Sequence, residues 1–254
     1  MLAVSLQSGS SGNCIYVEAA GVRLLFDAGL SGRQAELRLE RHGRDIRDVD
    51  ALIISHDHGD HIGFAGIYQR KYGLPVYATN GTMKAARRKL GLGRMHDVRH
   101  FVRGDVLDFG SVAVETVPTE HDAADGVGFV VVSEGKRLGI LTDLGHVFGR
   151  LERVMASLDA VFIESNYDPD RLATGRYPEY VKQRIRGPKG HLSNIEAAEL
   201  VAAHGKRLTW ACLAHLSEEN NDPDLALETA RGIVGKKLTL HVATRYRETG
   251  KLKV

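Results

Sequence analysis

A dense cluster of histidine and aspartate follows a short apolar run near residue 50. Ala51–Ile54 predicts a buried strand, and the six residues His56–His61 after it contain three histidines and two aspartates. Because alternate residues of an extended segment point to the same side, His56 and His58 are expected to share a face. A single histidine here would be best interpreted as part of a solvated polar loop. Three histidines and two aspartates together favour a metal site instead. The pattern suits two metal ions, one held by His56 and His58 and the other by Asp60 and His61.

The pattern His-x-His-x-Asp-His over His56–His61 resembles the signature of the metallo-β-lactamase superfamily of metal-dependent hydrolases. The order of predicted elements, strands first and then mixed strand–helix units in both halves, fits either two facing sheets or an ordinary three-layer α/β fold. The resemblance favours the four-layer αββα sandwich within the α/β class. Since no linker or low-complexity stretch interrupts the chain, residues 1–254 are expected to form a single domain.

The same resemblance implies three further ligands at the ends of predicted strands. His121 would join His56 and His58 on the first metal, His215 would complete the second site, and Asp143 would bridge both ions. The expected metal ligands are therefore His56, His58, Asp60, His61, His121, Asp143 and His215. Such nitrogen-rich sites with carboxylate suit zinc, and also manganese or iron. Asp27, which ends another predicted strand, is placed to support a metal-bound histidine.

Two divalent metals about 3.5–4 Å apart define a hydrolytic site. They hold a bridging water, lower its pKa so that hydroxide is available at neutral pH, and neutralise an oxyanion in the transition state. Asp60 is therefore counted among the catalytic residues as well as among the ligands. The metals alone do not say whether the bond cleaved is an ester, a lactam, a thioester or a phosphodiester.

Three later stretches resemble ribonuclease Z-like enzymes on the nuclease side of the superfamily. They begin at Glu164, at His191 and at His215. The resemblance implies that His191 faces the scissile phosphate, with Glu164 orienting it, and imidazole is a suitable proton donor near neutral pH. The alternative is that His191 belongs to a structural loop, because Ser193 and Glu196 after it predict a helix-starting capping box.

The combination of Ser8–Asn13, Gly187–Asn194 and Leu213–Ser217 resembles the bacterial YycJ (WalJ) family over nearly the whole chain. That resemblance implies exonuclease activity on DNA. Tyr167 stands where the family pattern leads us to expect histidine, which affects substrate contact and not the metals. The loop Ser8–Asn13 is either a phosphate cradle or a tight connection between strands, and it lacks the Lys-Ser/Thr of a P-loop.

A basic segment precedes His191, although the net charge of +2 gives no global field for nucleic acid. Its six cations could neutralise phosphates, and interleaved tyrosines could stack on bases, unless the segment is only a solvated amphipathic helix. The cations are Arg171, Arg176, Lys182, Arg184, Arg186 and Lys189, and the tyrosines are Tyr167, Tyr177 and Tyr180. The residues expected to bind substrate are Ser193, Asn194, Arg184, Arg186 and Lys189. The interval between Asp143 and His215 leaves no room for the large clamp domain that some nucleases of the superfamily insert there, and no extended arm for gripping tRNA is evident, so DNA ends or short nucleic acids are favoured.

Two other functions remain open from the sequence. A small-molecule metallohydrolase acting on a cyclic phosphodiester, lactone or thioester would keep every ligand but need no basic groove. A non-catalytic regulatory binding protein would be expected to lose ligands, and none is lost here. Cys14 and Cys212 lie in apolar surroundings and predict buried free thiols, which suit a reducing cytoplasm. With no targeting segment and no run of membrane-spanning length, we expect a cytoplasmic protein with no membrane partner.

Overall fold

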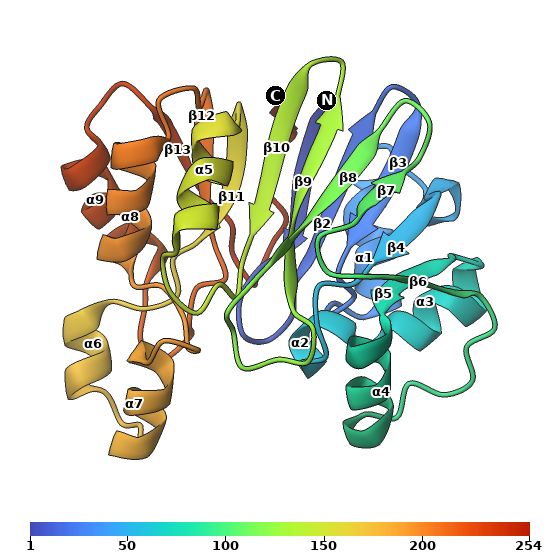
Figure 1. The fold of residues 1–254 in the computed structure, drawn as a ribbon, viewed down its shortest axis with the longest axis horizontal. Coiled ribbons are helices and arrows are strands. Elements are labelled where there is room, and N and C mark those ends of the chain that lie inside the picture. Colours follow the sequence, from blue (N-terminus) through green and yellow to red (C-terminus); the bar gives the residue numbers. More distant parts are fainter.

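The computed structural model describes residues 1–254 and contains two seven-stranded sheets that face each other (Figure 1). The first sheet has the order β14-β1-β2-β3-β4-β5-β6, with β1 Leu2–Gln7, β2 Cys14–Ala19, β3 Val22–Phe26, β4 Ala51–Ile53, β5 Val76–Thr79, β6 Val98–Phe101 and β14 Leu252–Lys253. The second has the order β13-β12-β11-β10-β9-β8-β7, with β7 Val106–Asp108, β8 Ala113–Pro118, β9 Val127–Ser133, β10 Lys136–Leu141, β11 Ala160–Glu164, β12 Trp210–Ala214 and β13 Thr239–Val242.

Helices cover the outer face of each sheet. The first half contributes α1 Gly32–Glu40, a 3-10 turn at Ile46–Asp48, α2 Gly59–Ile62, α3 Ala65–Tyr72 and α4 Asn80–Lys89. The second half contributes α5 Gly149–Ser157, α8 Asn194–His204 and α9 Pro223–Val234 to the outer face, whereas α6 Pro169–Thr174 and α7 Glu179–Arg186 lie beyond the lower edge of the sheet (Figure 1). One apolar core lies between the sheets, where Phe26 and Phe129 meet with ring centroids 5.1 Å apart, and two more lie beneath the helices. The expected four-layer αββα sandwich is confirmed.

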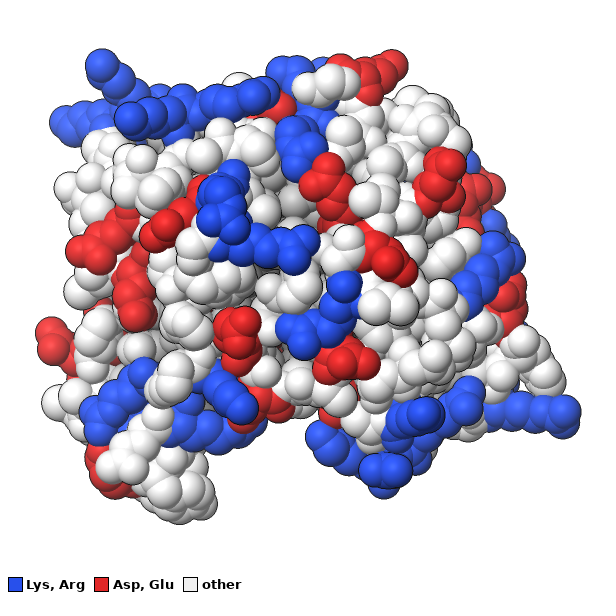
Figure 2. All heavy atoms as spheres, viewed as in Figure 1, with Lys and Arg blue, Asp and Glu red and all other residues white.

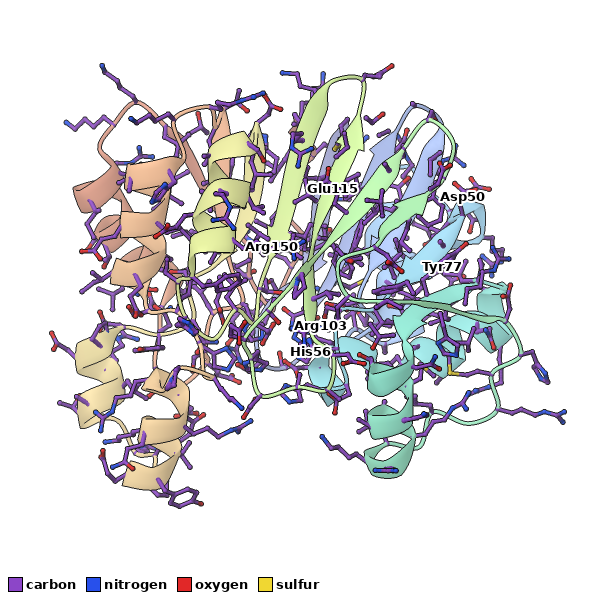
Figure 3. The ribbon with its side chains drawn as sticks, viewed as in Figure 1. Asp50, His56, Tyr77, Arg103, Glu115 and Arg150 are labelled. Carbon is purple, nitrogen blue, oxygen red and sulfur yellow. The ribbon has the colours of Figure 1, made fainter.

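Each sheet has an antiparallel and a parallel part, and the parallel parts position the site. Strands β10, β11 and β12 run parallel, with Glu164 directly opposite Ala214. The carboxyl ends of parallel strands lie at one edge of a sheet, so the loops after these strands are neighbours. In the facing sheet β4 ends at Ile53, and the His56–His61 loop follows it. Figure 3 shows His56 at this lower edge, among the side chains between the two sheets.

The predicted elements differ from the structure mainly where they are short. The residues Ile62–Tyr68 after the motif predict the start of one helix, but the structure has two helices, α2 and α3, and α2 already begins inside the motif, at Gly59. Helices α5 and α6 and strands β6, β7 and β14 were not predicted; the strands have four residues or fewer. The Ser193 capping box is confirmed, since Ser193 Oγ accepts from the Glu196 N–H while the Glu196 carboxylate accepts from the Ser193 N–H.

Both cysteines are buried free thiols, as expected. Burial raises the pKa of Cys14 to about 12, so this thiol stays protonated and unreactive. No helix of the structure combines the length and the apolar character needed to cross a membrane.

Candidate metal centre

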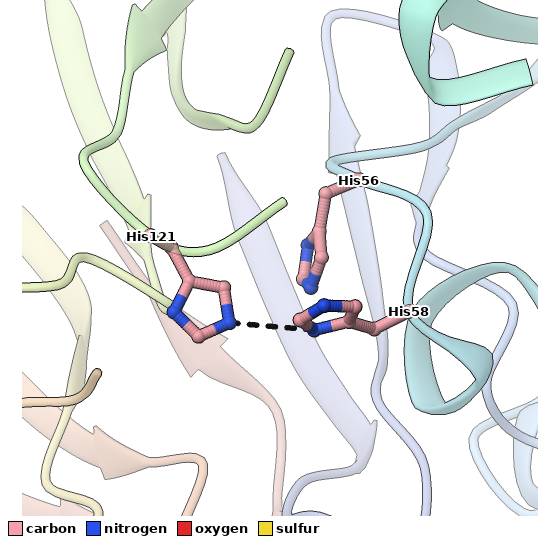
Figure 4. A group of neighbouring side chains, drawn as sticks. All are labelled: His56, His58 and His121. Carbon is pink, nitrogen blue, oxygen red and sulfur yellow. Dashed lines mark hydrogen bonds between the residues drawn. The ribbon is translucent and has the colours of Figure 1, made fainter. Parts of the chain in front are cut away.

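The first group of candidate ligands comes from two loops, one at the end of each facing sheet. His56 and His58 follow β4, and His121 follows β8. One ring nitrogen from each of the three lies within 4.8 Å of the other two. Figure 4 shows the rings converging, with Nε2 of His121 3.3 Å from Nδ1 of His58. Three imidazoles aimed at one point form a typical nitrogen-rich site for a divalent transition metal.

The second group is formed by Asp60, His61 and His215, whose donor atoms also lie within 4.8 Å of one another. Nε2 of His215 is 3.4 Å from Oδ2 of Asp60, and Nε2 of His61 is 3.5 Å from the same oxygen. His215 follows β12 of the second sheet, whereas Asp60 and His61 lie in α2 beside the first sheet. Both groups are therefore assembled across the interface between the sheets.

Asp143 lies between the two groups. One carboxylate oxygen is 3.1 Å from Nε2 of His61, and the other is 3.6 Å from Nε2 of both His121 and His215. The side chain is buried, and the backbone has φ 55°, a left-handed conformation that is uncommon for a residue other than glycine. The local backbone therefore aims one carboxylate at both groups, as a shared ligand requires.

The donor set fits two divalent metals. Nε2 of His56 and Oδ2 of Asp143 are buried without a hydrogen-bond partner, which is unusual for polar atoms inside a protein. Burial lowers the pKa of His56 well below its ordinary value, and the neighbouring His61 lowers it further, so His56 is neutral with a free lone pair. Metal ions would supply the missing partners, and the oxygen and nitrogen donors suit zinc, manganese or iron.

A second layer of side chains fixes the histidine rings. Oδ2 of Asp27 accepts a hydrogen bond from Nδ1 of His61 at 2.7 Å, which leaves Nε2 directed at the metal position. The same carboxylate accepts from the hydroxyl and the N–H of Ser55, both at 2.8 Å. Nδ1 of His121 donates to the carbonyl of Gly190 at 2.8 Å. Such contacts set the tautomer and orientation of metal-binding imidazoles, and the structure places Asp27 where the sequence predicted it.

Glu164 orients two histidines at once. Its Oε1 lies 2.6 Å from Nδ1 of His191 and 3.5 Å from Nδ1 of His215, and its Oε2 accepts from the N–H of Leu144 at 3.0 Å. Burial would raise the pKa of Glu164, but the adjacent His191 lowers it to about 2, so the group is a carboxylate. Glu164 is fully buried, so its carboxylate faces the cleft only by way of the two histidines that it contacts.

His191 lies at the edge of a cleft of about 370 Å³ above these groups. The cleft is lined by Ser10, Asp57, His58, Gly59, Asp60, Lys89, Leu90, His121, Asp143, Arg184, His191 and His215. Its two cations come from different helices, and each is paired with an aspartate beside a candidate ligand. Nζ of Lys89 lies 2.7 Å from Asp57, and Nε of Arg184 lies 2.6 Å from Asp122.

The other predicted substrate-binding residues lie outside this cleft. The side chains of Ser193 and Asn194 are buried and hydrogen-bonded within the protein, to Glu196 and to Ser165 and Asn221 respectively. We therefore assign them structural roles. Arg186 and Lys189 are exposed and do not line the cleft, and Arg186 is paired with Glu179. Of the three tyrosines suggested for stacking, Tyr167 is buried and Tyr180 is exposed.

Sequence reasoning missed several supporting residues. Asn13, at the end of the Ser8–Asn13 loop, has its amide nitrogen 3.0 Å from Nε2 of His61 and 3.4 Å from Oδ2 of Asp60. Oγ of Ser8 accepts from the N–H of His215 at 2.7 Å. Contacts from this loop therefore help to position the second group of candidate ligands. Gly12 of this loop lies so close to Gly29 that a Cβ on Gly12 would collide with the carbonyl oxygen of Gly29, so the small residues of the loop are needed for the close approach of the two chain segments.

The fold and the site define a metal-dependent hydrolase of the metallo-β-lactamase class. Comparison with known proteins agrees, since residues 22–215 match the family described as the β-lactamase superfamily domain. The chain is 36% identical over 236 residues to the exodeoxyribonuclease YycJ of Bacillus anthracis, covering 91% of this chain and 88% of that protein. It therefore belongs to the β-lactamase superfamily domain family and, within it, to the YycJ (WalJ) family.

A more distant similarity links the chain to ribonuclease Z of Bradyrhizobium diazoefficiens, with 28% identity over 268 residues, covering 85% of this chain and 87% of that one. Among solved structures, the metallo-β-lactamase fold protein YhfI from Bacillus subtilis superimposes with a TM-score of 0.74 at 16% identity, over 99% of both chains. This likeness supports the fold.

Proposed function

We propose that this protein is a DNA exonuclease that cleaves phosphodiester bonds with two divalent metals. The observation that carries the proposal is the His191–Glu164 pair, which lies beside a complete set of seven metal-ligand candidates and is not needed to complete that set. A proton donor in addition to the metals is what cleavage at a poor leaving group requires. The YycJ relative, named as an exodeoxyribonuclease, supports DNA as the substrate.

The metals would be held by His56, His58 and His121, by Asp60, His61 and His215, and by Asp143 between them. When bound, they supply Lewis-acid chemistry: a water is activated as the nucleophile, and negative charge on the phosphate is neutralised. Zinc and manganese are the ions we propose, and iron would also fit the donors. Asp60 would contribute to catalysis by holding a metal at the floor of the cleft.

His191 supplies the proton in this proposal. Glu164 accepts a hydrogen bond from Nδ1 of His191, so the other ring nitrogen, Nε2, is the atom available to a substrate in the cleft. Nε2 of the protonated ring would donate to the departing oxygen, and the buried Glu164 carboxylate would stabilise the charged ring. Glu164 is therefore a positioning residue whose effect passes through His191.

Arg184 is placed to hold the substrate phosphate. Its Nε is used by Asp122, which fixes the guanidinium at the rim and leaves its terminal nitrogens available. A guanidinium held in one orientation suits two-point contact with phosphate. Arg186 and Lys189 would extend this positive surface along α7 and the loop after it. We call the surface formed by Arg184, Arg186 and Lys189 the α7 wall. The cytoplasm is the proposed location, because the two free cysteines suit a reducing compartment.

The direct test is a side-by-side assay of purified, metal-loaded protein on end-labelled DNA, on RNA, and on a small phosphodiester, a lactone and a thioester. We expect stepwise shortening of DNA from an end, abolished by a chelator and restored by zinc or manganese. Faster turnover of a small ester than of any nucleic acid would instead support a small-molecule hydrolase. Binding of DNA without cleavage of any substrate would support a regulatory binding protein.

A further inference from the structure

Helix α4 carries a concentration of positive charge that the proposed function has not used. Its ten residues include Lys84, Arg87, Arg88 and Lys89, all exposed, and no acidic residue. Only Lys89 has an ion-pair partner; the other three have no carboxylate within 4.0 Å. On α7, by contrast, the cations Arg184 and Arg186 are both paired, so α4 offers charge left free for an external anion.

This helix is fixed to the two loops that carry the first group of metal ligands. At its end, Lys89 binds Asp57, which lies between His56 and His58, and Asp57 also accepts from the N–H of Ala124 at 2.8 Å. At its start, the hydroxyl of Thr82 donates to the carbonyl of Ala124 at 2.9 Å. Since both ends are tied to the site, the cations of α4 have a defined position relative to the metals.

The helix lies across the cleft from α7. Lys89 and Leu90 line one part of the cleft, and Arg184 and His191 line another. In Figure 1, α4 and α7 project downward on opposite sides of the sheet edge that carries the site. Figure 2 shows Lys and Arg gathered on both lower projections, with a notch between them. The floor with the metal ligands is therefore flanked by positive charge on two sides.

We propose that α4 is a second phosphate-binding wall, so that a single nucleic-acid strand crosses the cleft between α4 and α7. Phosphates on both sides of the scissile bond would then be held, by Lys84, Arg87 and Arg88 on one side and by the α7 wall on the other. This inference rests on the proposed function, and it adds that the preferred substrate is longer than the cleft itself. A small phosphodiester would contact the floor but not reach both walls.

A strand fits α4 better than a membrane surface does. Helices that bind anionic membranes combine cations with large apolar side chains that enter the bilayer. None of the exposed large apolar residues of this protein lies on α4, whose buried side chains Thr82, Met83 and Ala86 face the protein. Unpaired cations without apolar anchors suit a polyanion, whose condensed counterions are released on binding.

The test compares two triple variants of the metal-loaded protein. In the first, Lys84→Ala, Arg87→Ala and Arg88→Ala are combined; alanine has the highest helix propensity, so α4 should persist. The matched control combines Lys206→Ala, Lys236→Ala and Lys237→Ala, which removes the same charge. These three exposed lysines have no ion pair and precede the parallel strands β12 and β13, at the opposite edge of the sheet from His215. Thermal unfolding checks that both variants fold.

Binding of a hydrolysis-resistant phosphorothioate 12-mer single strand is measured against salt concentration. The α4 variant should reduce the slope of log affinity against log salt by about 2, at about 0.7 per phosphate contact, while the control keeps the wild-type slope. The ratio of kcat/KM for a 12-mer to that for a dinucleotide should also fall in the α4 variant. If the alanine variant unfolds, Lys84→Gln, Arg87→Gln and Arg88→Gln replace it.

An α4 variant with the wild-type salt slope, or a control whose slope falls as much, would overturn the inference. These outcomes are separate from failure of the proposed function. If the protein binds the strand through α4 but cleaves no nucleic acid, the second wall stands and the nuclease assignment fails. If it cleaves DNA with no contribution from α4, the reverse holds.

Discussion

The floor of the cleft, formed by the candidate metal ligands, is mostly buried, whereas its walls, formed by the cations of α4 and by those of the α7 wall, are exposed. The floor residues His61, Asp143 and His215 are at most 3% exposed, and each is held by contacts from several loops. The wall residues Arg184 and Arg88 are exposed, on helices whose other faces carry the packing. Ligand geometry depends on fixed atoms, whereas a phosphate backbone needs only charge at suitable spacing. Substitutions in the floor should therefore abolish function, and substitutions in the walls should weaken it by degrees.

The floor and the walls also differ in backbone conformation. Asp27, Asp143 and His215 all have positive φ, between 55° and 64°, which costs free energy for residues with a side chain. Such strain persists only where the surroundings determine the conformation, and all three lie at or beside the candidate metal ligands. Helices α4 and α7 contain no such residue. The floor of the cleft therefore contains strained backbone that fixes the direction of its side chains, and the two helices that form the walls contain none.

The largest effect is expected from Asp143→Ala. Because this carboxylate lies against both groups of ligands, its loss should weaken both metal sites and remove hydrolytic activity. Elemental analysis after metal loading should give nearly two metals per chain for the wild type and clearly fewer for the variant. His96→Ala, at an exposed residue that does not line the cleft, is the control and should keep both ions. A wild type that holds only one metal would contradict the dinuclear site.

The next largest effect is expected from His191→Ala. The residue is proposed to donate a proton and not to bind metal, so the variant should keep both ions and the fold. Its turnover number on DNA should fall by roughly 10²–10⁴-fold, the usual contribution of general acid–base catalysis. Loss of one metal would instead show that His191 is a ligand. One of its ring nitrogens lies within 4.8 Å of donor atoms of Asp143, Glu164 and His215, so this result would have a structural explanation. Unchanged turnover would reduce it to a structural loop residue.

A smaller effect is expected from Glu164→Gln, which keeps the shape but removes the charge that stabilises protonated His191. Turnover should fall by less than in His191→Ala, since the imidazole remains. The double variant should be clearly less impaired than the product of the two single effects, because the residues act as one unit. Fully multiplicative losses would show that Glu164 acts independently, through its 3.5 Å contact with His215. Metal content separates the two cases.

The sequence allowed the fold class and the convergence of seven candidate ligands to be predicted, because both leave local signals. Apolar runs marked the longer strands, and histidine or aspartate directly after them marked the shared edge of the sheets. The supporting contacts leave no such signal. Asp57 meets Lys89 32 positions away and Ala124 67 positions away, and only the folded chain brings them together.

The inward or outward direction of a polar side chain was equally hard to predict. Ser193 and Asn194 follow His191 and were expected to touch substrate, but the bridge between Tyr167 and Ser193 places this segment against the protein interior. The residues Thr82–Leu90 predict a basic helix, which the structure contains as α4. Its relation to the cleft depends on tertiary contacts from Thr82 and Lys89, so a function could be inferred only from the structure.

The smallest effect, and the one that tests the walls most directly, is expected from the combined variant Arg184→Ala and Arg186→Ala. Both side chains are exposed and already paired, with Asp122 and Glu179, so part of their charge is compensated before substrate arrives. Affinity for single-stranded DNA should fall moderately, and the salt slope should fall by roughly 0.7 for each phosphate that the variant no longer neutralises. The unpaired cations of α4 should therefore contribute a larger change per residue than these two. If the paired arginines prove to contribute more, direct two-point contact by Arg184 outweighs free charge, and the α7 wall is the principal site of phosphate binding.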